Sequence, residues 1–153
     1  MSNDSAYPVD ALEWPSTWHS CTVGIPFAGV EGVCDGCGKT LVGRQKRWCS
    51  VTCSDVIAVN HMWTQARHAA LRRDERACVR CGAKGTIDRP LEVNHITPIL
   101  GKHGVTGCHH HLDGLETLCH DCHVLVGYAQ RAGKAGPALD ILGPVAPTLE
   151  ASA

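Results

Sequence analysis

The stretch GCHHHLDGLETLCHDCH, residues 107–123, contains five histidines and three cysteines, the side chains that most often bind transition metals. Its end carries the pair Cys119-x2-Cys122, and a similar pair, Cys78-x2-Cys81, precedes it with thirty-seven residues between the two pairs. Two such pairs can bring four thiolates within reach of one tetrahedral zinc ion. We therefore expect a structural zinc bound by Cys78, Cys81, Cys119 and Cys122.

The loop that this zinc would close is longer than a simple zinc finger needs. It contains LEVNHITPI, residues 91–99, a β-like run, and it leads into a helix that we expect to begin near Leu118. A zinc ion at the four cysteines would clamp the strand region against this helix. His95 on the strand and His123 on the helix would then lie near each other.

A second set of cysteines precedes the first, with Cys34-x2-Cys37 followed by Cys49-x3-Cys53. This is the spacing of a zinc-ribbon or treble-clef module, and four sulfur ligands leave no open position for catalysis. We expect a second structural zinc here. Cys21 and Cys108 are left over, and we interpret them as plain buried thiols.

The composition agrees with a fold that is stabilised by bound metal. The chain of 153 residues has one Phe and two Tyr, so its core is poor in aromatic side chains. The start of the sequence has no basic region followed by an apolar run, and no stretch predicts a membrane-spanning helix. We therefore expect a protein of the reducing cytoplasm without a membrane partner, where clustered cysteines bind zinc more often than they form disulfides.

Positive charge is concentrated in the middle of the chain. Residues 34–91 carry eleven Lys or Arg against five acidic residues, although the whole chain has a formal charge of -1. Such a block is either a solvated face or a surface that binds phosphates, and charge alone does not decide between them. The candidates for nucleic-acid contacts are Arg44, Lys46, Arg47, Arg67, Arg72 and Arg73.

The sequence divides into five segments. Residues 1–33 form an irregular arm, 34–53 the first zinc module, 54–76 a linking helix of about five turns, 77–132 the second module and 133–153 a flexible tail. The helix is predicted by apolar residues at helical spacing, among them Val56, Val59, Met62, Ala66 and Ala70. The tail is predicted by its content of Pro, Gly and Ala and its weak periodicity.

The runs CVRCG, LEVNHITPI and LDGLETLCHDCH together resemble the His-Asn-His (HNH) endonuclease family, whose fold is called ββα-metal. The preceding cysteine module resembles an arrangement in actinobacterial and phage members. The resemblance implies that His95 is the general base that activates water. It also implies that His123 binds a catalytic divalent ion, Mg²⁺, Mn²⁺ or another transition metal.

Two positions depart from the family pattern. The residue before the base is usually an acid or a histidine that binds metal, whereas this chain has Asn94, whose amide oxygen is an uncharged and weaker ligand. The middle asparagine of the motif falls on Gly114, for which Asp113 or His111 can substitute. An inactive descendant that only binds DNA is the alternative that these departures leave open.

We expect a small α+β protein, a ββα-metal nuclease module preceded by a zinc-ribbon-like module and a long connecting helix. The expected function is metal-dependent hydrolysis of double-stranded DNA, with two structural zinc ions and one catalytic divalent cation. A non-catalytic zinc-finger DNA-binding protein and a partner in phage packaging are the competing interpretations. In the alternative interpretation, the histidines have no catalytic role and form a solvated or zinc-stabilising cluster of His109, His110, His111, His120 and His123.

Overall fold

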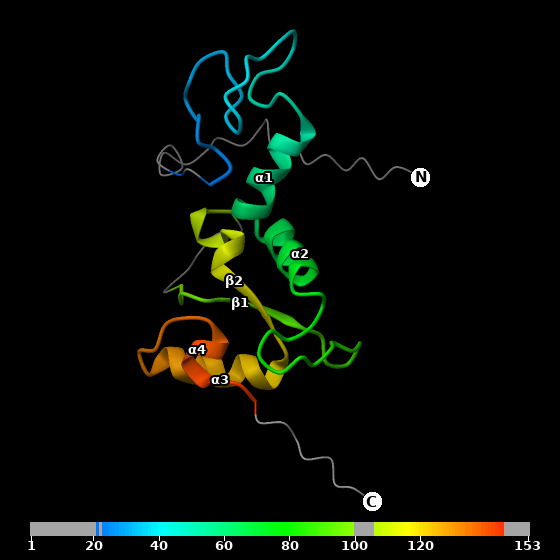
Figure 1. Ribbon diagram of the computed structural model, residues 1–153, viewed down its shortest axis with the longest axis vertical. Coiled ribbons are helices and arrows are strands. Elements are labelled where there is room, and N and C mark those ends of the chain that lie inside the picture. Colours follow the sequence, from blue (N-terminus) through cyan, green and yellow to red (C-terminus); the bar gives the residue numbers. More distant parts are fainter. Residues whose placement is uncertain (1–20, 22, 100–105, 146–153) are drawn as a thin grey trace, which may run out of the picture. The chain divides into compact units, whose positions relative to one another are not determined.

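The fold is small and mixes helices with one short sheet, as the sequence predicts. A computed structural model describes residue 21, residues 23–99 and residues 106–145 (Figure 1). Its elements in chain order are α1 (Val51–His61), α2 (Trp63–Arg73), β1 (Glu92–His95), the 3-10 turns η3 (Cys108–His110) and η4 (Leu112–Gly114), β2 (Leu115–Leu118), α3 (His120–Arg131) and α4 (Ala138–Leu142). Within these described residues, no helix has the length and apolar character needed to cross a membrane.

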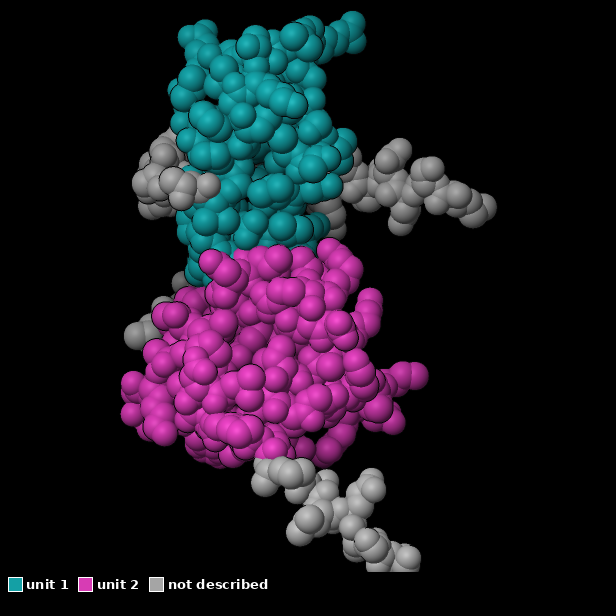
Figure 2. Space-filling model, in the orientation of Figure 1, with its two compact units in different colours: residues 1–66, 104–111 teal, residues 67–103, 112–153 magenta. Residues whose placement is uncertain are grey.

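The chain forms two compact units, which Figure 2 distinguishes by colour. Unit 1 comprises residues 1–66 and 104–111, and unit 2 comprises residues 67–103 and 112–153. The chain therefore passes between the units three times, and the segment that joins β1 to β2 contributes residues 104–111 to unit 1.

Unit 1 is built around the turn CDGCGK, residues 34–39. The Cys34 amide donates to the Lys39 carbonyl and the Gly38 amide donates to the Cys34 carbonyl. Gly38 has a φ of +72°, and a Cβ there would lie 3.0 Å from the Phe27 ring, so this turn needs glycine. Its core of buried side chains is small and consists of Ile25, Cys34, Trp48 and Ile57.

The linking helix predicted over residues 54–76 is not continuous. Met62 separates α1 from α2 in an extended conformation, with φ -113° and ψ 117°, and forms an isolated β-bridge with Thr106. The His61 carbonyl accepts a hydrogen bond of 2.8 Å from the Gly107 amide, which comes from a distant part of the chain. Helical spacing of the apolar residues predicts both helices correctly but contains no sign of this tertiary interruption.

Unit 2 begins with a turn of the same design. The Cys78 amide donates to the Ala83 carbonyl, and the Gly82 amide, at a φ of +75°, donates to the Cys78 carbonyl. After it, β1 pairs antiparallel with β2, with Glu92 opposite Leu118 and His95 opposite Leu115. The core that supports the sheet and α3 contains Cys78, Leu91, Leu118, Cys122, Val126 and Ala138.

The tail predicted over residues 133–153 is folded in the part that the structure describes. Helix α4 packs on α3, and Ala138 is completely buried. The Ala138 amide donates a hydrogen bond of 2.9 Å to Oε2 of Glu116, and the Gly143 carbonyl accepts one from Arg80. The prediction of a flexible tail is wrong here because a five-residue helix is too short to show a period, and its anchor is a polar contact.

We predict that α4 stabilises unit 2 through its inner face. Ile141 packs against the core of this unit, so Ile141→Ala should lower the free energy of unfolding by about 1–2 kcal/mol, somewhat less than for a completely buried side chain. Leu139 lies on the same helix and is 44% exposed, so Leu139→Ala is the matched control, with a change within about 0.5 kcal/mol. Urea titration of both variants measures the difference, and equal effects would contradict a docked α4.

Candidate active site and metal centres

The structure brings the four cysteines of unit 2 together. Cys78 and Cys81 come from the turn before β1, Cys119 caps α3 and Cys122 lies in its first turn. All four sulfur atoms lie within 4.8 Å of one another, with 3.7 Å between Sγ of Cys81 and Sγ of Cys119. A tetrahedral zinc with Zn–S bonds of about 2.3 Å needs sulfur atoms roughly 3.8 Å apart. The donor set therefore fits a structural metal ion.

Local hydrogen bonds favour the thiolate of Cys78 in this cluster. Burial raises the pKa of the Cys78 thiol, but the backbone amides of Cys119, Cys81 and Arg80 outweigh burial and lower this pKa to about 7. The Arg80 guanidinium also donates to Sγ of Cys122 at 3.4 Å. Donors of this kind help to neutralise four sulfur charges around one divalent ion.

The cysteines of unit 1 form an equivalent cluster. Cys34, Cys37, Cys49 and Cys53 lie within 4.8 Å of one another, with sulfur separations of 3.4 Å for Cys37 and Cys49 and 3.7 Å for Cys49 and Cys53. Burial raises the pKa of Cys34, but the amides of Cys49, Cys37 and Gly36 reverse this and lower it to about 6. This cluster fits a zinc-ribbon-like module.

The two histidines expected in the active site lie on the predicted elements. His95 ends β1, is half-buried, and its carbonyl accepts a hydrogen bond of 3.0 Å from Gln130 of α3. His123 lies in the first turn of α3, and its Nδ1 contacts a carboxylate oxygen of Glu92. The two strands and the helix follow one another in the ββα order, with His95 on the first strand and His123 on the helix.

Glu92 is a site residue that the sequence analysis missed. Its second carboxylate oxygen lies 2.9 Å from Nδ1 of His120, so one carboxylate joins two imidazoles of α3. Burial raises the pKa of Glu92, but the contacts with His120 and His123 outweigh burial and hold the pKa below its ordinary value. The sequence contained a sign of this position, because Glu92 precedes Asn94 by two residues and side chains two apart lie on the same face of a strand.

Asn94 has a different environment from the one expected for a metal ligand. It is buried, and its Nδ2 donates a hydrogen bond of 3.1 Å to Oε1 of Glu116 on the neighbouring strand. Glu116 in turn accepts from the Ala138 amide, so its buried carboxylate has a donor on each oxygen. The amide of Asn94 therefore satisfies a buried charge, and metal coordination by Asn94 stays a prediction.

The structure does not support His111 as the replacement for the missing asparagine. His111 belongs to unit 1, where its Nε2 lies 3.3 Å from Sγ of Cys21 and 3.2 Å from Nε2 of His61. Cys21 and Cys108 are half-buried members of the same cluster, which corrects their interpretation as plain buried thiols. Asp113 lies exposed in η4, beside Gly114, whose carbonyl accepts from the Ile96 amide.

The six candidate basic residues fall into two groups. Arg47 pairs with Asp35 at 3.1 Å, Arg67 donates to the Leu91 carbonyl, and Arg73 donates to the carbonyls of Leu112 and Leu115 as well as to Asp74. Arg44, Lys46 and Arg72 are exposed and form no ion pair with the described residues. Of these six, only Arg44, Lys46 and Arg72 are therefore available for contacts with a ligand in the described part of the chain.

A family comparison agrees with this geometry. Residues 78–128 match the family described as HNH endonuclease. The match covers a third of the chain. The matched range contains the four-cysteine cluster, β1, β2 and most of α3, and it supports nuclease-type chemistry with metal binding. Neither the curated proteins nor the solved structures gave a match to the chain.

We predict that unit 2 depends on its four-cysteine cluster for folding. Cys119→Ser should abolish metal binding at this cluster and make unit 2 sensitive to protease, because structural zinc contributes on the order of 10 kcal/mol to the folding of small domains. Asp121→Ala changes an exposed residue of the same helical turn and is the control that should keep metal and protease resistance. Metal analysis and limited proteolysis measure both effects. A metal-free Cys119→Ser protein as resistant as the control would contradict this dependence.

Proposed function

We propose that the protein is a metal-dependent endonuclease that hydrolyses phosphodiester bonds in double-stranded DNA. The observation that carries this proposal is the position of His95 at the end of β1 and of His123 at the start of α3 within the range that matches HNH endonucleases. His95 is the proposed general base, and its imidazole in the neutral form takes a proton from the attacking water.

The group around Glu92 is the proposed site of the catalytic divalent ion. His120, His123 and Glu92 supply two imidazole nitrogens and one carboxylate, a donor set that suits Mn²⁺ or another transition metal as well as Mg²⁺. The His123 and Glu92 side chains are 36% and 35% exposed, so water and substrate can reach them. A bound divalent ion offsets the charge that develops on the phosphate and the leaving oxygen.

Basic residues beside this group support a phosphate-containing substrate. Arg89 and Asp88 line a hollow of about 240 Å³ together with Glu92 and His120. A second hollow of about 300 Å³ in unit 2 is lined in part by Arg67 and Arg76. Guanidinium groups at such positions can bind backbone phosphates without reading the bases.

The competing proposal is a zinc-stabilised DNA-binding protein without catalysis, with a role as a partner in phage assembly as one form of it. The observations that favour it are the buried pairing of Asn94 with Glu116 and the glycine at position 114. A reducing cytoplasm is the proposed setting for either function, since all ten cysteines are free thiols in clusters that suit metal.

The two proposals predict different behaviour for His95→Ala. If His95 is the base, this variant should keep its bound zinc, its fold and its affinity for DNA but lose cleavage by about a hundredfold or more. His68→Ala is the matched control, because His68 is an exposed histidine of α2, and it should cleave like the wild type. Plasmid relaxation with Mg²⁺, Mn²⁺, Co²⁺ or Ni²⁺ measures the rates. A folded, metal-loaded wild type that cleaves nothing with any of these ions would exclude the nuclease.

Arg44, Lys46 and Arg72 are predicted to bind DNA phosphates. Binding by the His95→Ala protein should weaken when each is changed to Ala, and the slope of log K against log salt should fall by about 0.9 for each phosphate that is no longer neutralised. Arg73→Ala should instead lower the melting temperature, since Arg73 holds the carbonyls of Leu112 and Leu115. Fluorescence anisotropy at several salt concentrations and thermal melts separate the two groups. An unchanged slope would show that the exposed residues are only solvated.

A further inference from the structure

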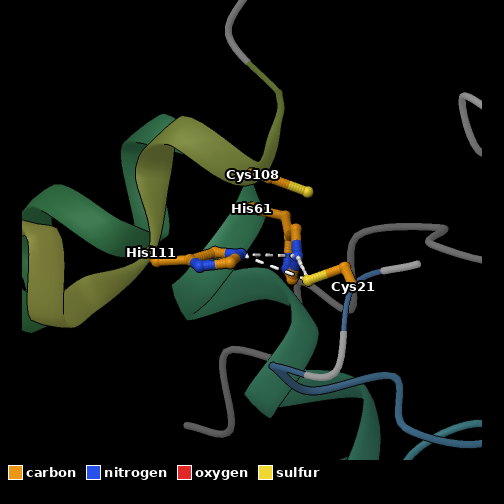
Figure 3. Close-up of side chains that lie close together, drawn as sticks. All are labelled: Cys21, His61, Cys108 and His111. Atoms are coloured by element: carbon orange, nitrogen blue, oxygen red, sulfur yellow. Dashed lines mark hydrogen bonds between the residues drawn. The ribbon is translucent and has the colours of Figure 1, made fainter. Parts of the chain in front are cut away.

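Four metal-binding side chains meet in unit 1 at a place distinct from both four-cysteine clusters. They are Cys21, His61 at the end of α1, Cys108 in η3 and His111 directly after it (Figure 3). One ligand atom from each lies within 4.8 Å of the other three. Figure 3 shows these side chains, from three separate segments, pointing toward a common centre.

The distances suit one tetrahedral ion. Nε2 of His61 lies 3.2 Å from Nε2 of His111, and Sγ of Cys21 lies 3.2 Å from the first and 3.3 Å from the second. Zinc with bonds of about 2.0–2.1 Å to nitrogen and about 2.3 Å to sulfur places two nitrogens roughly 3.3 Å apart and a nitrogen and a sulfur roughly 3.6 Å apart. The ligand atoms of Cys21, His61 and His111 thus need only a small expansion to hold zinc, and Sγ of Cys108 lies within 4.8 Å of all three.

The orientation of His61 is fixed by a second contact. Its Nδ1 lies 3.1 Å from the Ile57 carbonyl one turn earlier in α1, so Nδ1 carries the proton and donates it. Nε2, which faces the cluster, is then an acceptor with an available lone pair. Metal-bound histidines usually have such a backbone carbonyl on the other ring nitrogen. His61 is also completely buried, an unusual place for an imidazole without a specific polar role.

The backbone around the cluster is shaped to bring the ligands together. The helix ends at His61 because its carbonyl accepts from Gly107, and the next residue, Met62, pairs with Thr106. Gly107, at a φ of +155°, leads into η3, which presents Cys108 and His111 at a spacing of three residues. The interruption between α1 and α2 therefore coincides with the meeting point of the four side chains.

We propose that Cys21, His61, Cys108 and His111 form a third metal site, a closed Cys2His2 zinc site. Two sulfurs and two nitrogens in a tetrahedral arrangement are the donor set that selects zinc among common metals. Four protein ligands leave no position for water or substrate, so the ion is structural. Its role is to fasten residues 106–111, part of the long connection between β1 and β2, to α1 and to Cys21.

Metal content of the full-length protein tests this site. Protein purified with a reducing agent and without chelator should contain three zinc ions per chain, two in the four-cysteine clusters and one here. Cys108→Ser should contain two and melt at a lower temperature. His109→Ala is the matched control, because His109 lies in the same 3-10 turn outside the cluster, and it should keep three.

Two zinc ions in the folded, reduced wild type would overturn the proposal and leave the four groups as a hydrogen-bonded cluster. An unchanged zinc content in Cys108→Ser, or equal losses in Cys108→Ser and His109→Ala, would overturn it as well. An ion at Glu92, His120 and His123 would add equally to the counts of the wild type and both variants, so the loss of one ion in Cys108→Ser does not depend on the proposed nuclease activity.

A second variant guards against simple misfolding of Cys108→Ser. His111→Cys keeps four ligands and should retain three metal ions. After exchange to Co²⁺, its visible spectrum should gain sulfur-to-cobalt charge-transfer intensity and shift to longer wavelength, as expected when a nitrogen ligand becomes sulfur. A His111→Cys protein with the wild-type cobalt spectrum would show that position 111 does not bind the ion.

Discussion

The convergence of Cys78, Cys81, Cys119 and Cys122 is the constraint on which unit 2 depends. Its apolar core has few large side chains, and two of its six buried members are themselves cysteines of this cluster. Burial of so little apolar area does not offset the conformational entropy of a small domain, which is why such domains use metals as staples. With these sulfurs joined, α3 starts at a fixed point, and His120 and His123 are placed beside Glu92 of β1.

A buried carboxylate is the second constraint on the same unit. Glu116 has two donors from different elements, Nδ2 of Asn94 on β1 and the amide of Ala138 on α4. A buried carboxylate without these partners would cost several kcal/mol, so the strand pair and α4 are coupled through one side chain. This coupling gives a physical reason for an asparagine at position 94. An aspartate at position 94 would place a second negative charge against Glu116.

The sequence predicted those parts of the molecule that are determined by residues close together in the chain. Pairs of cysteines separated by two or three residues indicate metal ligands by spacing alone, and alternating or helical patterns indicate β1, α1 and α2. The third cluster could not be predicted in this way. Cys21 and His61 are isolated, forty residues apart, and His111 is hidden among three consecutive histidines of which at most one or two can face a common point. The end of α1 at His61 and the docking of α4 were missed because each depends on a hydrogen bond between residues distant in sequence.

The ligand groups differ in how many positions of a metal ion they would leave for water or substrate. This difference distinguishes the groups that stabilise the fold from the group proposed for catalysis. In the clusters of unit 1 and in the four-cysteine cluster of unit 2, four protein ligands would fill every position of a tetrahedral ion. In the proposed catalytic site, Glu92, His120 and His123 would supply only three groups on a solvent-exposed side of α3, which leaves positions for water and a phosphate oxygen. A chain that holds its fold with closed sites can leave this one incomplete group free for reaction. His95, the proposed base, lies on the strand that also carries Glu92, so one short element holds the base and part of the proposed ion site, and Gln130 of α3 donates a hydrogen bond to the His95 carbonyl.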